Sequence, residues 1–334
     1  MEPADSLACY LVNRDEAGEV QATYTQHPRA DLPAGEVLIQ VHWSSLNYKD
    51  ALAASGHPGV VRSFPHVPGV DAAGVVLESQ DSQWSPGDEV VVTGYELGAG
   101  HWGGWAELIR VPSAWVVARP DGLTLRDCMS YGTAGLTAAA CVEALRSHGV
   151  EPGGEGEVLV TGASGGVGSI ALMLLAKLGY QAVALTGKPQ LAELLEQWGA
   201  ARVILREDWQ DTSEKPLLRG HWQGGIDVAG GATLSQLLRE TSPRGTVAAC
   251  GMVAGADLPV TVYPFILRGV TLAGIDSAWT DHQTKCHYWN QLTGPWRLDF
   301  PADYLVETPL AEVDQQVEKM LQSQTTGRIV VQVT

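Results

Sequence analysis

The sequence predicts an α/β fold in which a doubly wound parallel sheet domain is inserted into a smaller β-barrel-like domain. Short strand patterns separated by Gly and Pro turns fill the first 127 residues, as in small all-β barrels. After them, strand patterns alternate with helical ones, which is typical of an open parallel sheet. The last stretch, 328–333, again resembles the first strands. We therefore expect residues 1–127 to form the β domain, 128–295 the sheet domain, and 296–334 a tail that completes the β domain.

Turn residues divide the β domain into its expected strands. Ser85 to Asp88 predicts a β-turn, and 98–105 is a glycine-rich loop. The expected strands are 35–43, 69–77, 88–92, 106–111 and 115–118.

The sheet domain and the tail show six further strand patterns and six helical ones. The expected strands are 158–160, 182–185, 201–204, 225–229, 245–250 and 269–275. The expected helices are 131–147, 169–178, 191–198, 233–239, 281–292 and 313–322. The last strand of the sheet is expected to form an edge that could pair with a second copy of the chain in a homodimer.

A glycine-rich turn inside the sheet domain predicts a dinucleotide site. It follows the strand 158–160 directly and opens the helix 169–178, within a β-α-β unit. We expect Gly165 to let the chain turn and approach a pyrophosphate closely, and Gly168 to let the helix pack against the strand. The unpaired N–H groups at the start of the helix would then bind the phosphates.

The end of the next strand indicates which dinucleotide binds. An NAD site has an acidic residue about 20 positions past the glycines, which binds the ribose 2′-hydroxyl. Here that position holds Thr186, Gly187 and Lys188, with no carboxylate. A hydroxyl and a cation suit a 2′-phosphate, and Arg206 after the third strand could reach the same phosphate. The sequence therefore favours NADPH.

Composition excludes several classes of partner. The net charge of −17 disfavours a nucleic-acid surface, which needs clustered Lys and Arg. No apolar run is long enough for a membrane span, and the first residues lack a secretory signal. The five cysteines form no CxxC pair, which fits reduced thiols in the cytoplasm. We expect a cytoplasmic protein with a small-molecule substrate.

Several motifs carry a resemblance to a known family over nearly the whole chain. They are Ser44 to Leu52, Pro65 to Gly74, Gly132 to Gly135, Thr161 to Gly168, Pro264 to Val270 and Gly274 to Ser277. Together they resemble the medium-chain dehydrogenase/reductase superfamily, its quinone-oxidoreductase-like branch, and there the bacterial acryloyl-CoA reductase subfamily. The resemblance implies a Rossmann domain inserted in a GroES-like catalytic domain, with NADPH and substrate between them.

The resemblance also implies a set of cofactor contacts. They are Tyr48, Ser164, Gly165, Gly166, Val167, Gly168, Thr186, Gly187, Lys188, Arg206, Met252, Ile266 and Ser277. Lys188 stands where relatives often have Arg, and a Lys lacks the bidentate fork of Arg.

No metal is expected. The zinc alcohol dehydrogenases of this superfamily have a Cys where this chain has Asn47, and a His-Glu pair where it has Gly69 to Asp71. The clustered cysteines of their structural zinc site are also missing. A catalytic zinc needs about three converging protein ligands, so we expect none.

A metal-free site favours reduction of an activated C=C bond over reduction of a ketone. Hydride would go to the β-carbon of an enoyl thioester or enone, and the carbonyl oxygen would need hydrogen-bond donors while the α-carbon takes a proton. Asn47 and Tyr48 are the candidate donors or acid, with Lys49 and Asp50 as supporting residues. A helix N-cap at Asn47 would explain the same residues without chemistry.

Three functions remain open from the sequence. The first is reduction of acryloyl-CoA to propanoyl-CoA, the second is an NADPH-dependent quinone or enone oxidoreductase, and the third is a non-catalytic NADPH-binding protein. Arg62, Arg268 and Arg297 are candidates for binding the phosphates of coenzyme A.

Overall fold

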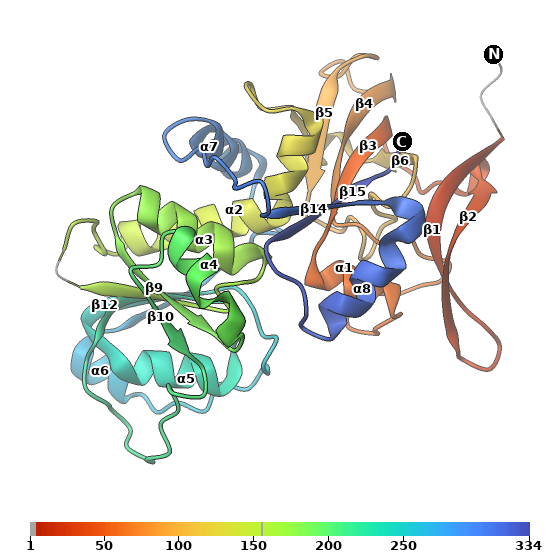
Figure 1. Cartoon of the computed structure of the whole chain (residues 1–334). Coiled ribbons are helices and arrows are strands. Elements are labelled where there is room, and N and C mark those ends of the chain that lie inside the picture. Colours follow the sequence, from red (N-terminus) through yellow and green to blue (C-terminus); the bar gives the residue numbers. More distant parts are fainter. Residues whose placement is uncertain (1–4, 155) are drawn as a thin grey trace. The chain divides into compact units, whose positions relative to one another are not determined.

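The chain divides into two compact units, which we describe separately. The computed structural model describes residues 5–154 and 156–334 (Figure 1). Unit 1 consists of the described residues up to Thr133 together with Ala278–Thr293 and Asp299–Thr334. Unit 2 consists of Ala134–Ser277 and Gly294–Leu298 without residue 155.

Unit 1 is built on a seven-stranded sheet that joins the strands of residues 37–118 with two strands of the C-terminal tail. Its order is β14 (Leu305–Pro309), β15 (Arg328–Gln332), β3 (Val37–Leu46), β4 (Asp71–Ser79), β5 (Glu89–Thr93) and β7 (Val116–Ala118), with β6 (Leu108–Val111) also paired to β3. The C-terminal strand β15 runs antiparallel to β3, with Ile329 opposite Leu46. The two strands of the tail thus extend the sheet that β3 to β7 form.

Apolar clusters hold unit 1 together, and two of them involve its longest strands and helices. In β3, the alternating residues Val37, Ile39 and Val41 are buried in one cluster with residues of β4, β5 and β6, as the two-residue period of a strand requires. The second cluster packs the helices α1 (Tyr48–Ala54) and α8 (Val313–Leu321) against β1 (Ser6–Arg14). Ala51 of α1 and Val317 of α8 both belong to it.

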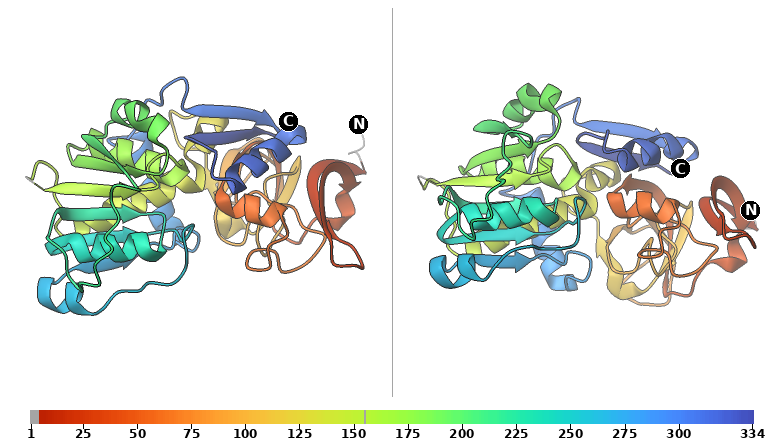
Figure 2. Two further views of the ribbon diagram at one scale, coloured as in Figure 1. Left: turned by 60° about the horizontal axis from the view of Figure 1, so that its bottom comes forward. Right: turned by 90° about the horizontal axis from the view of Figure 1, so that it is seen from below.

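The sequence patterns missed three strands of unit 1. β1 and β2 (Val20–Pro28) form an antiparallel hairpin that is a sheet of its own, drawn in red in Figure 2. Alternation is hidden in β1 because six consecutive residues from Leu7 to Val12 are buried. β14 was missed because a single residue of its five, Thr308, is buried.

Unit 2 is an all-parallel six-stranded sheet. Its order is β10 (Arg202–Leu205), β9 (Gln181–Thr186), β8 (Glu157–Thr161), β11 (Trp222–Asp227), β12 (Thr241–Ala249) and β13 (Thr271–Gly274). This is the 3-2-1-4-5-6 order of a doubly wound dinucleotide-binding domain, whose strand order reverses between β8 and β11. The predicted fold class is confirmed, and β13 is an edge strand as expected.

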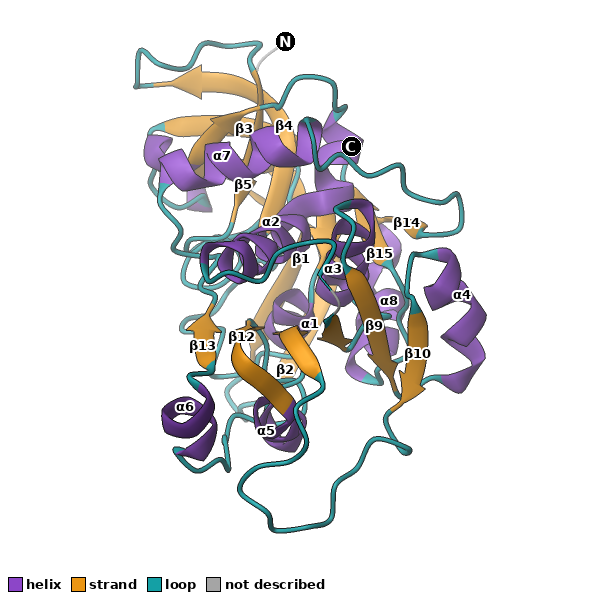
Figure 3. Cartoon of the chain, turned by 90° about the vertical axis from the view of Figure 1, so that its left-hand side faces the viewer, coloured by secondary structure: helices purple, strands orange, loops and turns teal. Residues whose placement is uncertain are grey.

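Helices cover both faces of this sheet. Figure 1 shows α3 (Gly166–Lys177) and α4 (Ala192–Gln197) on one side of the strands, and α5 (Gly231–Glu240) and α6 (Tyr263–Arg268) on the other. Figure 3 shows β9 and β10 side by side, with α4 next to β10. The described residues also contain four 3-10 turns: η1 (Arg29–Asp31), η2 (Ser113–Trp115), η3 (Pro189–Leu191) and η4 (Leu310–Glu312).

The boundary between the units differs from the predicted one. The helix α2 (Leu125–Ser147) starts earlier than expected and breaks at Gly132, whose φ of 50° and ψ of −152° are not helical. Helix α7 (His282–Thr293) belongs to unit 1 instead of the sheet domain. The reason is the buried Lys285, whose Nζ donates to the carbonyl oxygen of Thr93 at 2.8 Å.

Among the described residues, no helix is long and apolar enough to cross a membrane.

Candidate active site

The glycine turn of unit 2 has the geometry of a phosphate-binding loop, but one glycine role was assigned to the wrong residue. Gly162 makes the turn after β8, with a φ of +56°. Gly165 has a φ of −86°, so the turning role predicted for it is wrong. A Cβ on Gly168 would lie 2.4 Å from the carbonyl oxygen of Gly162, which confirms the close packing predicted there. The approach of Gly165 to a pyrophosphate stays a prediction.

The start of α3 presents the donors that a phosphate needs. Gly165 is its N-cap, and Gly166 and Val167 begin the helix with half-buried side-chain positions, while Ser164 is buried. The first backbone N–H groups of a helix have no partner within the helix and carry the positive end of its dipole. The predicted residues 164–168 therefore lie together, at the carboxyl end of β8.

The four residues predicted to bind a 2′-phosphate are brought together at the ends of β9 and β10. The backbone N–H of Arg206 donates to the carbonyl oxygen of Thr186 at 2.8 Å. The N–H of Lys188 donates to the Thr186 hydroxyl at 3.1 Å. A Cβ on Gly187 would lie 2.8 Å from Nη2 of Arg206, so the guanidinium lies against this glycine. Burial lowers the pKa of Lys188, which an anion beside it would offset.

Met252 and Ser277 follow the carboxyl ends of β12 and β13, at the same edge of the sheet. The hydroxyl groups of Ser277 and Thr137 are 2.6 Å apart, which holds the segment after β13. Ile266 is not brought to this edge. It lies on α6, directly before β13, and the neighbouring Arg268 donates to the carbonyl oxygens of Arg239 and Thr241, where β12 begins.

In unit 1, the buried carboxylate of Asp71 joins three segments of the chain. Its Oδ1 accepts hydrogen bonds from the backbone N–H of Thr133 at 2.9 Å and from the Thr133 hydroxyl at 2.6 Å. Its Oδ2 accepts from the Ser45 hydroxyl at 2.5 Å and from Nδ2 of Asn47 at 2.8 Å. β3, β4 and the break in α2 therefore meet at one side chain.

Asp50 is fully buried and ties the start of α1 to the segment before β4. Its Oδ1 accepts from the N–H groups of Gly69 and Val70, at 3.1 and 2.8 Å. Its Oδ2 accepts from the N–H of Asn47 at 2.8 Å, as the third residue of a capping box does. Burial and the nearby charge of Asp71 raise the pKa of Asp50 to about 7.

Arg328 completes this cluster. The sequence patterns do not identify it as a site residue. It is the first residue of β15 and is 2% exposed. Its guanidinium donates to the carbonyl oxygens of Leu46, Met129 and Ser130, at 3.4, 3.2 and 3.1 Å. It also donates to Oδ1 of Asn47 at 3.0 Å. The available signal was its place at the head of the apolar strand 329–331.

The cluster changes the roles predicted for 47–50. The amide of Asn47 is fully occupied, because its Nδ2 donates to Ser45, Asp50 and Asp71 and its Oδ1 accepts from Arg328. The prediction that Asn47 donates to a substrate is therefore not supported.

Tyr48 and Lys49 are the members of this motif whose polar groups bind no described residue. The side chain of Tyr48 is 39% exposed, and its hydroxyl makes no hydrogen bond to any described residue. Lys49 is exposed, and Asp50 binds the backbone at the start of α1; their supporting role in catalysis stays a prediction. Within the described residues, no group of three or more His, Cys, Asp or Glu side chains is placed to hold a metal ion.

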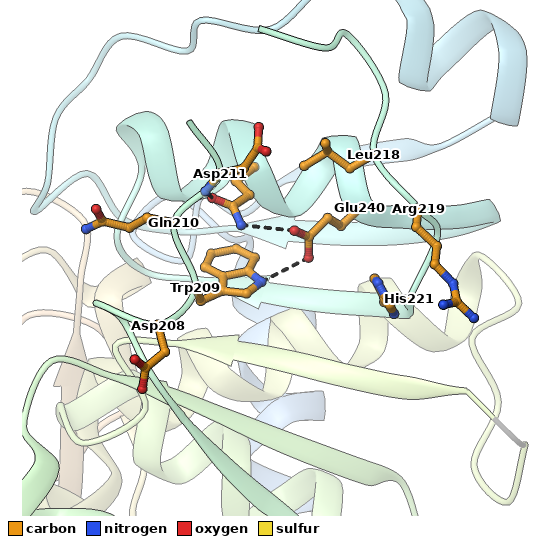
Figure 4. A pocket seen from close by; sticks show the side chains of 9 residues that line it. Asp208, Trp209, Gln210, Asp211, Leu218, Arg219, His221 and Glu240 are labelled. Carbon is orange, nitrogen blue, oxygen red and sulfur yellow. Dashed lines mark hydrogen bonds between the residues drawn. The ribbon is translucent and has the colours of Figure 1, made fainter. Parts of the chain in front are cut away.

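A separate cavity of about 240 Å³ lies in unit 2, between the segment after β10 and helix α5 (Figure 4). The Glu240 carboxylate accepts hydrogen bonds from the indole N–H groups of Trp209 and Trp222 and from the amide of Gln236, each at 2.9 Å. Asp211 is paired with Arg239. These polar groups fasten the segment to the helix, and none of the predicted site residues lines the cavity.

Comparison with known proteins places this geometry in a family. Residues 33–121 match the alcohol dehydrogenase GroES-like domain, and residues 166–288 match the model described as zinc-binding dehydrogenase. The chain is 42% identical to acrylyl-CoA reductase AcuI of Ruegeria pomeroyi, over 97% of this chain and 98% of that protein. It is 43% identical to the probable acrylyl-CoA reductase AcuI of Escherichia coli, over 97% and 99%.

Comparison with solved structures leads to the same family. The structure of Escherichia coli YhdH with bound NADPH superposes with a TM-score of 0.94 at 43% identity, covering 98% of this chain and all of that one. Bacillus subtilis yhfP with NAD bound also gives 0.94, at 40% identity over 99% and 100%. The chain therefore belongs to the medium-chain dehydrogenase/reductase superfamily of oxidoreductases. Within it, the chain belongs to the quinone-oxidoreductase-like branch that contains the acrylyl-CoA reductases.

The buried carboxylate of Asp50 predicts a pH dependence of stability. Its pKa rises from an ordinary 3.8 to about 7 in the folded chain, so ionisation is harder there than in the unfolded chain. The contribution of Asp50 to the free energy of unfolding should therefore fall as the pH rises from about 4 to about 7, and stay constant outside this window. This contribution is measured by urea unfolding of the wild type and of Asp50→Asn across this pH range.

The difference in unfolding free energy, wild type minus Asp50→Asn, should decrease across the window. Asp121→Asn, at an exposed position of the same unit, is the matched control for the loss of one carboxylate. A difference that stays flat or increases with pH would contradict the environment described for Asp50.

Proposed function

We propose that this protein is an NADPH-dependent reductase of activated C=C bonds that works without a metal and converts acryloyl-CoA to propanoyl-CoA. The observation that carries the proposal is the identity of 42–43% to two acrylyl-CoA reductases over 97% of the chain. The surroundings of Tyr48 support the metal-free part of the proposal, because the carboxylates of Asp50 and Asp71 accept hydrogen bonds from other groups of the chain.

The cofactor proposal rests on the ends of β9 and β10. The Arg206 guanidinium lies against Gly187, beside Lys188 and the Thr186 hydroxyl, and these groups fit a ribose 2′-phosphate. The Escherichia coli relative was solved with NADPH, and the Bacillus subtilis relative with NAD. We assign NADPH because no carboxylate stands at 186–188 to bind a free 2′-hydroxyl. Residues 164–168, Met252 and Ser277 complete the proposed contacts.

The chain's own groups would assist the reduction in two ways. Bound NADPH supplies a hydride for the β-carbon of the acceptor. As the hydride arrives, negative charge develops on the thioester oxygen, and the α-carbon needs a proton. The Tyr48 hydroxyl is available to donate to that oxygen or to deliver the proton, and α1 is held in place by Asp50.

A second candidate function is reduction of a quinone or an enone by the same hydride chemistry. A relative at 44% identity over 90% of the chain is named putative quinone oxidoreductase YhfP. A non-catalytic NADPH-binding protein is the third candidate.

Among the arginines considered for coenzyme A, Arg268 is occupied by backbone carbonyls, whereas Arg62 is 76% exposed and 3.7 Å from Glu96. We therefore favour Arg62 as a contact to the coenzyme.

We further propose a homodimer and a cytoplasmic location. The edge strand β13 follows helix α6, where Ile266 and Leu267 and the preceding Val262 are exposed, which suits pairing with a second copy. All five cysteines are free, which fits a reducing compartment.

Replacing Lys188 tests the cofactor assignment. Lys188→Ala should weaken NADPH binding by about 1.5–3 kcal/mol, the range for a hydrogen bond to a charged group, and leave NADH binding little changed. Fluorescence titration with both cofactors measures this. Arg202→Ala, which removes an exposed arginine of β10 paired with Glu157, is the matched control. Equal losses for NADPH and NADH would remove the 2′-phosphate role.

An acceptor panel tests the reaction. NADPH oxidation is followed with acryloyl-CoA, crotonyl-CoA and a small quinone at matched concentrations, and we expect kcat/KM to be highest for acryloyl-CoA. Turnover confined to the quinone would replace our first function with the second. No turnover with any acceptor would favour the non-catalytic protein.

Sedimentation velocity tests the dimer. We expect a species of two chains at micromolar concentration, and a single chain for Ile266→Lys, because a charge on this apolar surface opposes pairing. A single chain for the wild type at this concentration would contradict the homodimer.

A further inference from the structure

We propose that Arg328 is a positioning residue of the reduction, which holds Asn47 and the start of helix α1 so that Tyr48 meets the acceptor in one fixed geometry. The proposal rests on the reductase function proposed above. Arg328 acts through the residues that it binds and does not touch the acceptor.

The guanidinium of Arg328 is a buried cross-link between two segments of unit 1. It donates to the carbonyl oxygen of Leu46 and to Oδ1 of Asn47 at the start of α1. On its other side it donates to the carbonyl oxygens of Met129 and Ser130, in the first part of α2. A planar group with five N–H donors can serve these acceptors together, whereas an ammonium has three donors at one point.

The bond to Asn47 decides which way its amide points. Because Oδ1 accepts from Arg328, Nδ2 is directed to Ser45, Asp50 and Asp71. Without Arg328, Oδ1 would lose this charged donor, which would weaken the restraint on the amide and on its hydrogen bonds to both carboxylates. Tyr48 is the next residue of the chain and the first of α1, so its position depends on this arrangement.

Charge gives Arg328 a second role. The two carboxylates that Asn47 joins, Asp50 and Asp71, are buried with it, and Tyr304 faces the guanidinium from the segment before β14. A buried negative charge without a nearby positive one is strongly disfavoured. Removing the guanidinium should therefore favour the protonated form of Asp50, which accepts fewer hydrogen bonds at the start of α1.

Packing around the guanidinium is tight at the break of α2. Gly132, where α2 breaks, is confined between the two charged partners: a Cβ there would lie 2.5 Å from Oδ2 of Asp71 and 3.0 Å from Nη2 of Arg328. Asp71 in turn binds Thr133, the last residue of unit 1 before the chain enters unit 2. The cluster thus fixes both α1 and the point at which the chain leaves the unit.

The test compares Arg328→Met, which removes charge and donors, with Arg328→Lys, which keeps the charge. For Arg328→Met we expect kcat to fall about 10- to 100-fold, the range for residues that orient reactive groups through hydrogen bonds, with KM and NADPH affinity nearly unchanged. The acid limb of its kcat profile should move to higher pH. For Arg328→Lys we expect a lower kcat with the acid limb near that of the wild type. Arg110→Met, which removes an arginine of β6 paired with Glu78, is the control and should change neither.

Circular dichroism and NADPH titration identify the variants that remain folded, and Arg328→Lys keeps the test open if Arg328→Met does not fold. The assays use whichever acceptor the wild type reduces, so a failure of the acryloyl-CoA assignment is recognised separately in the wild type. The proposal is overturned if the folded variants lose only thermal stability or KM, with kcat and the acid limb unmoved. It is also overturned if Arg110→Met produces the same changes.

Discussion

The burial of Arg328 together with Asp50 and Asp71 is the constraint on which unit 1 depends. Charged groups inside a protein are tolerated only when hydrogen bonds and opposite charges surround them, so this cluster determines which segments must meet. It brings β15 from the end of the chain against β3 and α1, and it holds α2 where that helix breaks at Gly132. The start of α1 is thus held by charge and hydrogen bonding at positions where, by the resemblance, zinc dehydrogenases have metal ligands.

Unit 2 meets a different requirement, the binding of phosphate by a chain with a net charge of −17. Long-range attraction of an anion is weak for such a chain, so the binding must come from local donors. The first N–H groups of α3 provide them without any added charge. Lys188 and Arg206 add positive charge only at the ends of β9 and β10. This need for local donors explains why the start of α3 and the two cations lie at one edge of the sheet.

The sequence was informative where a local pattern decides the structure. The β-α-β unit, the order of helices and strands in unit 2, and the return of 328–333 to the first domain followed from periodicity and turn residues. It was misleading where tertiary contacts decide. Gly162 makes the turn that the sequence predicts for Gly165. Helix α7 belongs to unit 1 because Lys285 is bound there. The amide of Asn47 is hydrogen-bonded to side chains 24 and 281 positions away. The place of Arg328 at the head of an apolar strand indicates its burial, but no local pattern reveals its partners, because they come from distant segments.

The central claim is that hydride goes to the β-carbon of an activated C=C bond while the α-carbon takes its proton from the protein or water. It is tested most directly by reducing acryloyl-CoA with unlabelled NADPH in deuterium oxide and locating deuterium in the product by NMR. The account predicts one deuterium at the α-carbon and none at the β-carbon. Deuterium at the β-carbon, or a product without any deuterium, would contradict it.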